Sequence, residues 1–85
     1  MSAETFVHLP TEVGAVQWLG DYSAFPAEWR ASGSLLLEDG VLTVITGKGP
    51  ATARIGDYVL FSWWDEFWPV TEMKFLASYR RKADA

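Results

Sequence analysis

Few side chains of this sequence are suited to catalysis. His8 is the single histidine, and no serine or aspartate close to it belongs to a catalytic motif. Asp57, Asp65 and Glu66 flank an aromatic segment, an arrangement that glycosidases use for paired carboxylates. Asp57, however, follows a glycine at a predicted corner, where an aspartate commonly binds backbone amides, and the other two occupy a predicted turn. We therefore expect a protein that is not an enzyme, with a hydrolase built on these carboxylates as the minor alternative.

Metal and phosphate sites have equally few candidate residues. With one histidine and no cysteine, a zinc site would consist mostly of carboxylates, so we expect no metal and no cofactor. Residues 47–50, Gly-Lys-Gly-Pro, contain glycines and a lysine but lack the spacing of a P-loop, and the proline has no amide donor. We expect a hairpin loop there. Lys48 and Arg54 are the ligand-binding candidates in the alternative that the protein binds a small anion.

The segment from residue 57 to residue 68 holds six aromatic rings in twelve positions. Side chains of a strand alternate between its two faces, so both faces of this strand would be largely apolar. Core packing accounts for Val59, Phe61 and Trp63, but one short helix leaves little to cover the remaining rings. Trp and Tyr are enriched in protein interfaces. We expect a partner-binding patch with an acidic rim, formed by Tyr58, Trp63, Trp64, Asp65, Glu66 and Trp68; complete burial of the rings and a small-ligand pocket are the alternatives.

The charge of the chain is unevenly distributed. Residues 1–79 carry four basic and ten acidic side chains, a net charge of −6, and residues 80–85 return +2. An acidic body disfavours a phosphate backbone, so we expect no direct nucleic-acid binding and a partner protein with a basic surface. No apolar run approaches the roughly 20 residues of a membrane span, and the lack of cysteine fits a reducing cytoplasm. We expect a cytoplasmic protein that does not bind membranes.

Turn signals divide the chain into short elements. We predict an irregular segment over residues 1–13, one domain over residues 14–79 and a flexible basic tail over residues 80–85. The predicted strands cover residues 14–19, 34–38, 41–46, 52–55 and 58–64, with Asp39-Gly40 as a tight hairpin turn. A helix is predicted over residues 23–30, with Ser23 as its cap, Pro26 in its first turn, and Phe25 and Trp29 four residues apart on one face. Thr71 is expected to cap a last helical turn that ends near Tyr79. Pro69 is expected to end the segment that starts at Glu66.

These elements predict a small α+β domain. Five or six short antiparallel strands would form one curled sheet, an SH3-like open barrel, with one helix and a short C-terminal helical turn.

Several short motifs occur in a familiar order. Residues 16–21 read VQWLGD, residues 55–58 read IGDY, and residues 66–69 read EFWP, followed by Phe75 and Tyr79. Over residues 14–79 the chain resembles a widespread group of short, uncharacterised bacteriophage and prophage proteins. Their usual motifs are a VQW-x-GD start, a PGD-aromatic corner and a GEFYP ending, so Ile55, Asp65 and Trp68 depart from the pattern. The resemblance implies a phage origin and a compact β-rich fold, and it assigns no functional residue.

Together these features predict a small, non-enzymatic phage accessory protein in the host cytoplasm. It would bind a host protein with a basic surface through the aromatic patch, and inhibition of a host defence or nucleic-acid-processing machine fits its acidity. The alternative is a small-molecule or nucleotide-binding protein, in which an aromatic slot stacks a nucleobase and Lys48 or Arg54 meets the phosphate. A homodimer that uses the aromatic strand is compatible with the first hypothesis.

Overall fold

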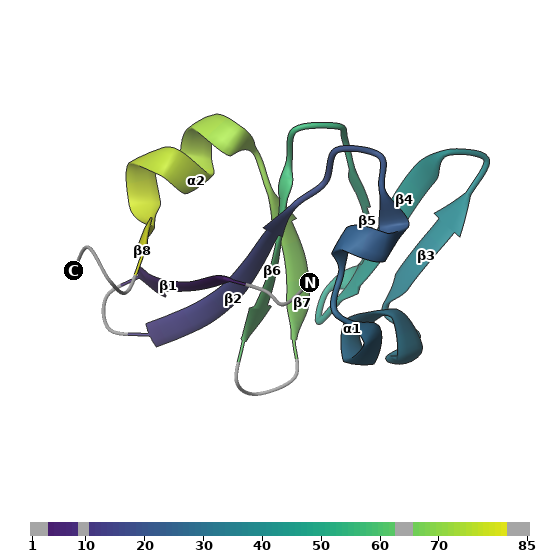
Figure 1. The fold of residues 1–85 in the computed structure, drawn as a ribbon, viewed down its shortest axis with the longest axis horizontal. Helices are drawn as coiled ribbons and strands as arrows, with labels where there is room; N and C mark the ends of the chain where they lie inside the picture. Colours follow the sequence, from purple (N-terminus) through teal and green to yellow (C-terminus); the bar gives the residue numbers. More distant parts are fainter. Residues whose placement is uncertain (1–3, 9–10, 63–65, 82–85) are drawn as a thin grey trace.

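Two antiparallel β-sheets make up most of the computed structural model, which describes residues 4–8, 11–62 and 66–81 (Figure 1). The five-stranded sheet has the order β7-β6-β2-β1-β8, and the three-stranded sheet has the order β3-β4-β5. The strands are β1 (Glu4–His8), β2 (Thr11–Gln17), β3 (Leu35–Glu38), β4 (Val41–Thr46), β5 (Gly49–Ala53), β6 (Tyr58–Ser62), β7 (Phe67–Val70) and β8 (Arg80–Arg81). The helices are the 3-10 turn η1 (Tyr22–Ala24), α1 (Ala27–Ala31) and α2 (Glu72–Ser78).

The fold is thus mostly β, with two short α-helices. The sequence predicts a single curled sheet, but among the described residues no strand of one sheet pairs with a strand of the other. Instead, β4 and β5 lie against β7, the edge strand of the larger sheet. No helix in the described part of the chain is long and apolar enough to cross a membrane.

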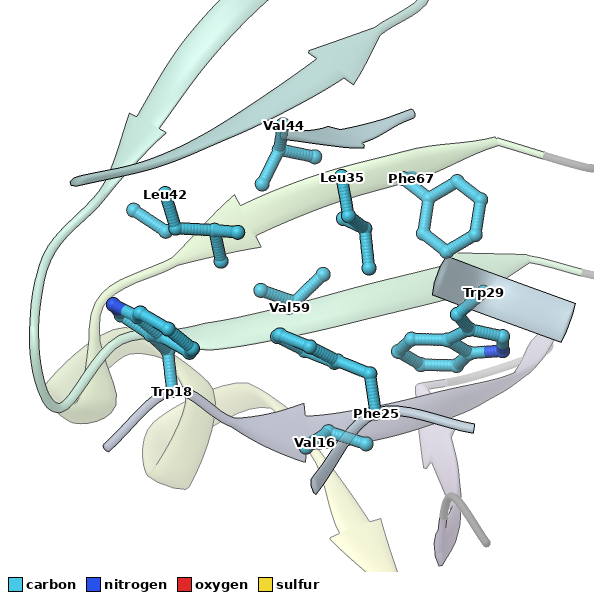
Figure 2. Close-up of a cluster of buried hydrophobic side chains, with 10 residues drawn as sticks. Val16, Trp18, Phe25, Trp29, Leu35, Leu42, Val44, Val59 and Phe67 are labelled. Atoms are coloured by element: carbon cyan, nitrogen blue, oxygen red, sulfur yellow. The ribbon is translucent and has the colours of Figure 1, made fainter. Parts of the chain in front are cut away.

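The main core lies between the two sheets, and we call it the inter-sheet cluster (Figure 2). Its buried members are Val16, Trp18, Phe25, Trp29, Leu35, Leu42, Val44, Ala53, Val59 and Phe67. The rings of Trp18, Phe25 and Trp29 follow one another in a row, with centroids 5.7 and 6.1 Å apart. Aromatic pairs in such geometry add about 0.5–1.5 kcal/mol beyond the burial of their surface.

A second core lies on the opposite face of the five-stranded sheet, beneath α2, and we call it the α2 cluster. It consists of buried Val13, Ala15, Leu60 and Phe75, with half-buried Tyr58, Trp68, Val70 and Tyr79 packed around them. Strand alternation produces this division, as predicted for residues 58–62: Val59 and Phe61 join one cluster, and Tyr58 and Leu60 the other. Both faces of β6 are therefore covered by the fold.

The β3–β4 hairpin forms as predicted. Asp39 and Gly40 both have positive φ angles, 50° and 77°, which a two-residue turn between twisted strands requires. The pairing of Leu35 with Val44 and of Leu37 with Leu42 then follows from the turn. Thr71 also caps α2 as predicted, because its side chain accepts a hydrogen bond from the Lys74 amide.

The predicted helix over residues 23–30 is divided in the structure. Asp21 rather than Ser23 caps the first part, η1, by accepting hydrogen bonds from the Ser23 hydroxyl at 2.6 Å and the Ser23 amide at 3.0 Å. These bonds lower the pKa of the Asp21 carboxyl, the side-chain bond most. Pro26 then begins α1 as its N-cap instead of lying in its first turn. Phe25 and Trp29 are both buried, as their spacing predicts.

Both ends of the chain are more regular than predicted. Residues 4–8 and 11–17 form β1 and β2 where an irregular segment up to residue 13 is expected, and β8 pairs with β1 where a loose tail is expected. Pairing between strands, which short segments without a clear turn signal do not reveal in sequence, explains the difference: β1 pairs with β2 and with β8. The strand predicted over residues 52–55 lies earlier, over Gly49–Ala53. Pro69 does not end its segment, because β7 is an edge strand, where proline is tolerated.

Candidate functional site

The described rings of the aromatic segment are not exposed. Phe67 is buried, and Tyr58, Phe61 and Trp68 are half-buried. The Tyr58 ring stacks on Phe75 with centroids 3.8 Å apart. The fold thus covers Tyr58, Phe67 and Trp68, for which one short helix was expected to provide little cover, because α2 forms a second core on the other face of the sheet. Trp63, Trp64 and Asp65, the rest of the predicted patch apart from Glu66, lie outside the described residues.

Tyr79 closes the α2 cluster beside Trp68. Its ring stacks on Phe75 with centroids 5.1 Å apart. Because Tyr58 also stacks on Phe75, the Phe75 ring contacts both tyrosine rings. Burial raises the pKa of the Tyr79 phenol, and a hydrogen bond with the Trp68 side chain lowers it in part. Trp68 thus has an internal partner, which gives it a structural role in the fold.

Glu66 is exposed and immediately precedes β7. Its amide donates to the Ser62 hydroxyl at 3.1 Å, and its carbonyl accepts from the Ser62 amide at 2.9 Å. Its carboxylate lies over Gly47, where an added Cβ would come within 3.0 Å of the carboxylate oxygen. A cavity of about 490 Å³ lies here, lined by Thr46, Gly47, Lys48, Glu66, Phe67 and Trp68.

The cavity brings one predicted cation close to two residues of the predicted patch, but it does not include Arg54. Lys48 precedes β5 and Arg54 follows it, and a five-residue strand spans about 17 Å. The structure therefore places the two ligand-binding candidates at opposite ends of one strand. A ligand in this cavity would therefore meet Lys48 and not Arg54.

Asp57 has the structural role that its position after glycine predicts. Its carboxylate accepts a hydrogen bond from the Arg54 amide at 2.9 Å, and its own amide donates to the Arg54 carbonyl. It therefore fastens the corner between β5 and β6. Within the part of the chain that the structure describes, no group of three or more His, Cys, Asp or Glu side chains could hold a metal ion.

Exposed apolar side chains gather in two other places. The first, which we call the corner surface, comprises Leu19 and Ile55 next to the β5–β6 corner and Met73 and Leu76 on α2. Gln17 links its parts, because the Gln17 amide group donates to the Gly56 carbonyl and to the Glu72 carboxylate, both at 3.0 Å. Helix α2, which carries Met73 and Leu76, has both an acidic residue, Glu72, and a basic residue, Lys74.

The second place is the side of β3–β5 that faces away from the inter-sheet cluster, and we call it the outer sheet face. Strand register places Leu36, Glu38, Val41, Thr43, Ile45, Pro50 and Thr52 on this face. Leu36, Val41 and Ile45 are 44%, 50% and 38% exposed, respectively. A shallow hollow of about 310 Å³ lies among them, lined by Leu36, Glu38, Asp39, Val41 and Thr43.

Charge makes the outer sheet face distinct from the corner surface. Both charged residues that line its hollow, Glu38 and Asp39, are carboxylates, and none of the described lining residues is basic. Apolar side chains beside two carboxylates suit a ligand that presents an apolar group next to a cation. The outer sheet face is therefore the surface on which the described residues best fit a partner.

Sequence reasoning did not single out this face, although a signal was present. Leu35, Leu36 and Leu37 are consecutive in a strand, so the middle leucine must point to the side opposite its two neighbours. With Leu35 buried in the inter-sheet cluster, Leu36 has to face outward.

In comparisons with protein-family models, curated proteins and solved structures, the chain gave no match.

Proposed function

We propose that the protein is a non-enzymatic binding protein that docks a partner protein on the outer sheet face. The observation that carries this proposal is the exposure of Leu36, Val41 and Ile45 beside the carboxylates Glu38 and Asp39. Exposed apolar groups contiguous on one sheet face commonly mark interaction sites. The partner would present apolar and basic side chains, which agrees with the basic partner surface predicted from the charge of the chain.

The resemblance to phage proteins gives this proposal its biological setting. In that setting the partner is a host protein in the cytoplasm, and an acidic domain that binds its basic surface would inhibit a defence or nucleic-acid-processing machine. We also propose that the two sheets together form an SH3-like open barrel. The contact of β4 and β5 with β7 supports this arrangement.

A capture experiment with matched variants tests the docking surface. The tagged chain is compared with Val41→Lys and Met73→Lys, which change exposed side chains on the outer sheet face and the corner surface, 50% and 83% exposed. We expect wild type and Met73→Lys to retain the same partner from host lysate, and Val41→Lys to lose it. A partner that Val41→Lys still retains fully would contradict the proposal. Trp68→Ala, with its fold verified, tests the aromatic patch in the same assay.

Small-ligand binding is the second candidate function, because the cavity beside Lys48 has the size of a ligand site. Its volume of about 490 Å³ is within the roughly 300–1,000 Å³ common for small-molecule pockets. Lys48 supplies a cation and Phe67 an apolar wall for an aromatic anion such as a nucleotide. Native mass spectrometry of protein purified from infected cells would show a retained ligand, and a clean apo mass would remove this candidate.

A further inference from the structure

The edge of the three-stranded sheet is open at β3. The opposite edge strand, β5, lies against β7, whereas no described strand pairs with the outer side of β3. Figure 1 shows β3 at the end of the molecule farthest from α2 and β8. An open edge presents unpaired backbone groups, which can bind another extended chain.

Hydrogen-bond alternation shows which backbone groups are presented. The Ile45 amide donates to the Ser34 carbonyl at 2.8 Å, so these two residues form a hydrogen-bonded pair. Such pairs alternate along an antiparallel ladder. Leu36 and Glu38 therefore direct their backbone groups toward β4, and Leu35 and Leu37 direct theirs away from it. The Leu35 carbonyl accepts from the Tyr22 hydroxyl at 2.8 Å, which leaves the Leu35 amide and both groups of Leu37 for a partner.

A second copy of this chain fits the edge poorly. An antiparallel pair centred on Leu36 would need the Leu35 carbonyl, which Tyr22 already occupies. An antiparallel pair centred on Leu37 would place each Glu38 carboxylate against Leu36 of the partner copy, without a cation. The edge therefore suits a strand of different sequence.

We infer that an extended segment of the partner adds to β3 as an antiparallel strand and fills the hollow of the outer sheet face. The inference rests on the proposed function and specifies how the partner binds. Added strands of this kind gain affinity from main-chain hydrogen bonds and specificity from alternate side chains. The partner residue opposite Leu37 exchanges two backbone hydrogen bonds with it.

The side chains that flank this partner residue face the hollow. In an antiparallel strand, the residue that follows it lies opposite Leu36, and the residue that precedes it lies opposite Glu38. An apolar side chain opposite Leu36 would contact Leu36 at the rim of the hollow. A Lys or Arg opposite Glu38 would meet the two carboxylates of the hollow, Glu38 and Asp39. The expected recognition motif is therefore a basic residue, any residue, and then an apolar residue, in extended conformation.

A labelled peptide with the central sequence Lys-Thr-Ile, flanked by Thr and Ser, is the direct probe. We expect fluorescence anisotropy to show saturable binding, and hydrogen exchange to show slower exchange of the Leu37 amide in the complex. N-methylation of the central Thr removes the donor that faces the Leu37 carbonyl and should weaken binding at least fivefold, since one hydrogen bond of about average strength is lost. Replacing the peptide Lys by Glu should weaken it further, because three carboxylates would then share the hollow.

Variants of the protein test the same geometry from the other side. Leu37→Pro removes the outward-facing amide at an edge position where proline is tolerated, and Leu37→Ala retains this amide. We expect at least fivefold weaker peptide binding for Leu37→Pro than for Leu37→Ala. The N-methylated peptide gives the same information if Leu37→Pro does not fold.

The outcomes separate the inference from the proposed function. Peptide binding that ignores both N-methylation and Leu37→Pro, or no peptide binding at all, overturns strand addition. The proposed function survives either result if capture of the partner still depends on Val41. Loss of that dependence overturns the proposed function itself.

Discussion

Tyr79 shows at the scale of one residue how the fold uses an aromatic ring that sequence alone cannot place. Its phenol lies half-buried in the α2 cluster, stacked on Phe75 and hydrogen-bonded with Trp68. The sequence predicts only that a helix ends near Tyr79. Phe75 packs on the five-stranded sheet beneath it. The sequence gives only weak signals for β1 and β2, the N-terminal strands of this sheet.

The raised pKa of Tyr79 gives a prediction about alkaline stability. The neutral phenol is favoured in the folded state, so its contribution is complete below the unfolded pKa of about 10 and is lost as the pH rises through the higher folded pKa. The free energy of unfolding should therefore fall less steeply above about pH 10 in Tyr79→Phe than in wild type. Urea unfolding at a series of pH values measures the slopes, and identical slopes would contradict the prediction.

At the scale of secondary-structure elements, the hairpin that carries the outer sheet face depends on its turn. Gly40 has a φ of 77°, and an added Cβ would meet nothing within 4 Å. The cost of Gly40→Ala is therefore conformational, and we expect a loss of about 1–2 kcal/mol in the free energy of unfolding. Asp39→Asn is the matched control, because Asn tolerates the left-handed region, and it should be nearly neutral. A large effect of Asp39→Asn in urea unfolding would show that its side chain matters for another reason.

The elements that sequence predicts correctly are those with local signals. Asp39-Gly40 specifies a tight turn, and Thr71 caps α2, so both are predictable from a few neighbouring residues. Strand β8 is missed because its pairing with β1, at the other end of the chain, has no local signal. Strand β1 is missed although it pairs with the next strand, β2, because no Asn-Gly or Asp-Gly signal stands between the two. The candidate site follows the same rule: Asp57 was assigned its structural role correctly, whereas the outer sheet face required the register of β3 and β4.

At the scale of the whole molecule, the larger sheet has a core on each face. Strand β2 contributes Val16 to the inter-sheet cluster and Val13 to the α2 cluster, and β6 contributes Val59 and Leu60 in the same way. Neither cluster can lose its packing without loosening strands that the other needs. The two cores should therefore unfold together, which is common for domains of this size.

Paired substitutions test this coupling. Val44→Ala in the inter-sheet cluster and Val13→Ala in the α2 cluster remove buried methyl groups, and each should lower the free energy of unfolding by about 1.5–3 kcal/mol. Because the two side chains belong to separate clusters, the double variant should show the sum to within about 0.5 kcal/mol. Urea unfolding followed by tryptophan fluorescence and by far-ultraviolet circular dichroism should give one coincident transition for every variant. Two separate midpoints in Val13→Ala would mean that α2 and its cluster unfold independently, since Trp18 and Trp29 report on the inter-sheet cluster and Trp68 on the α2 cluster.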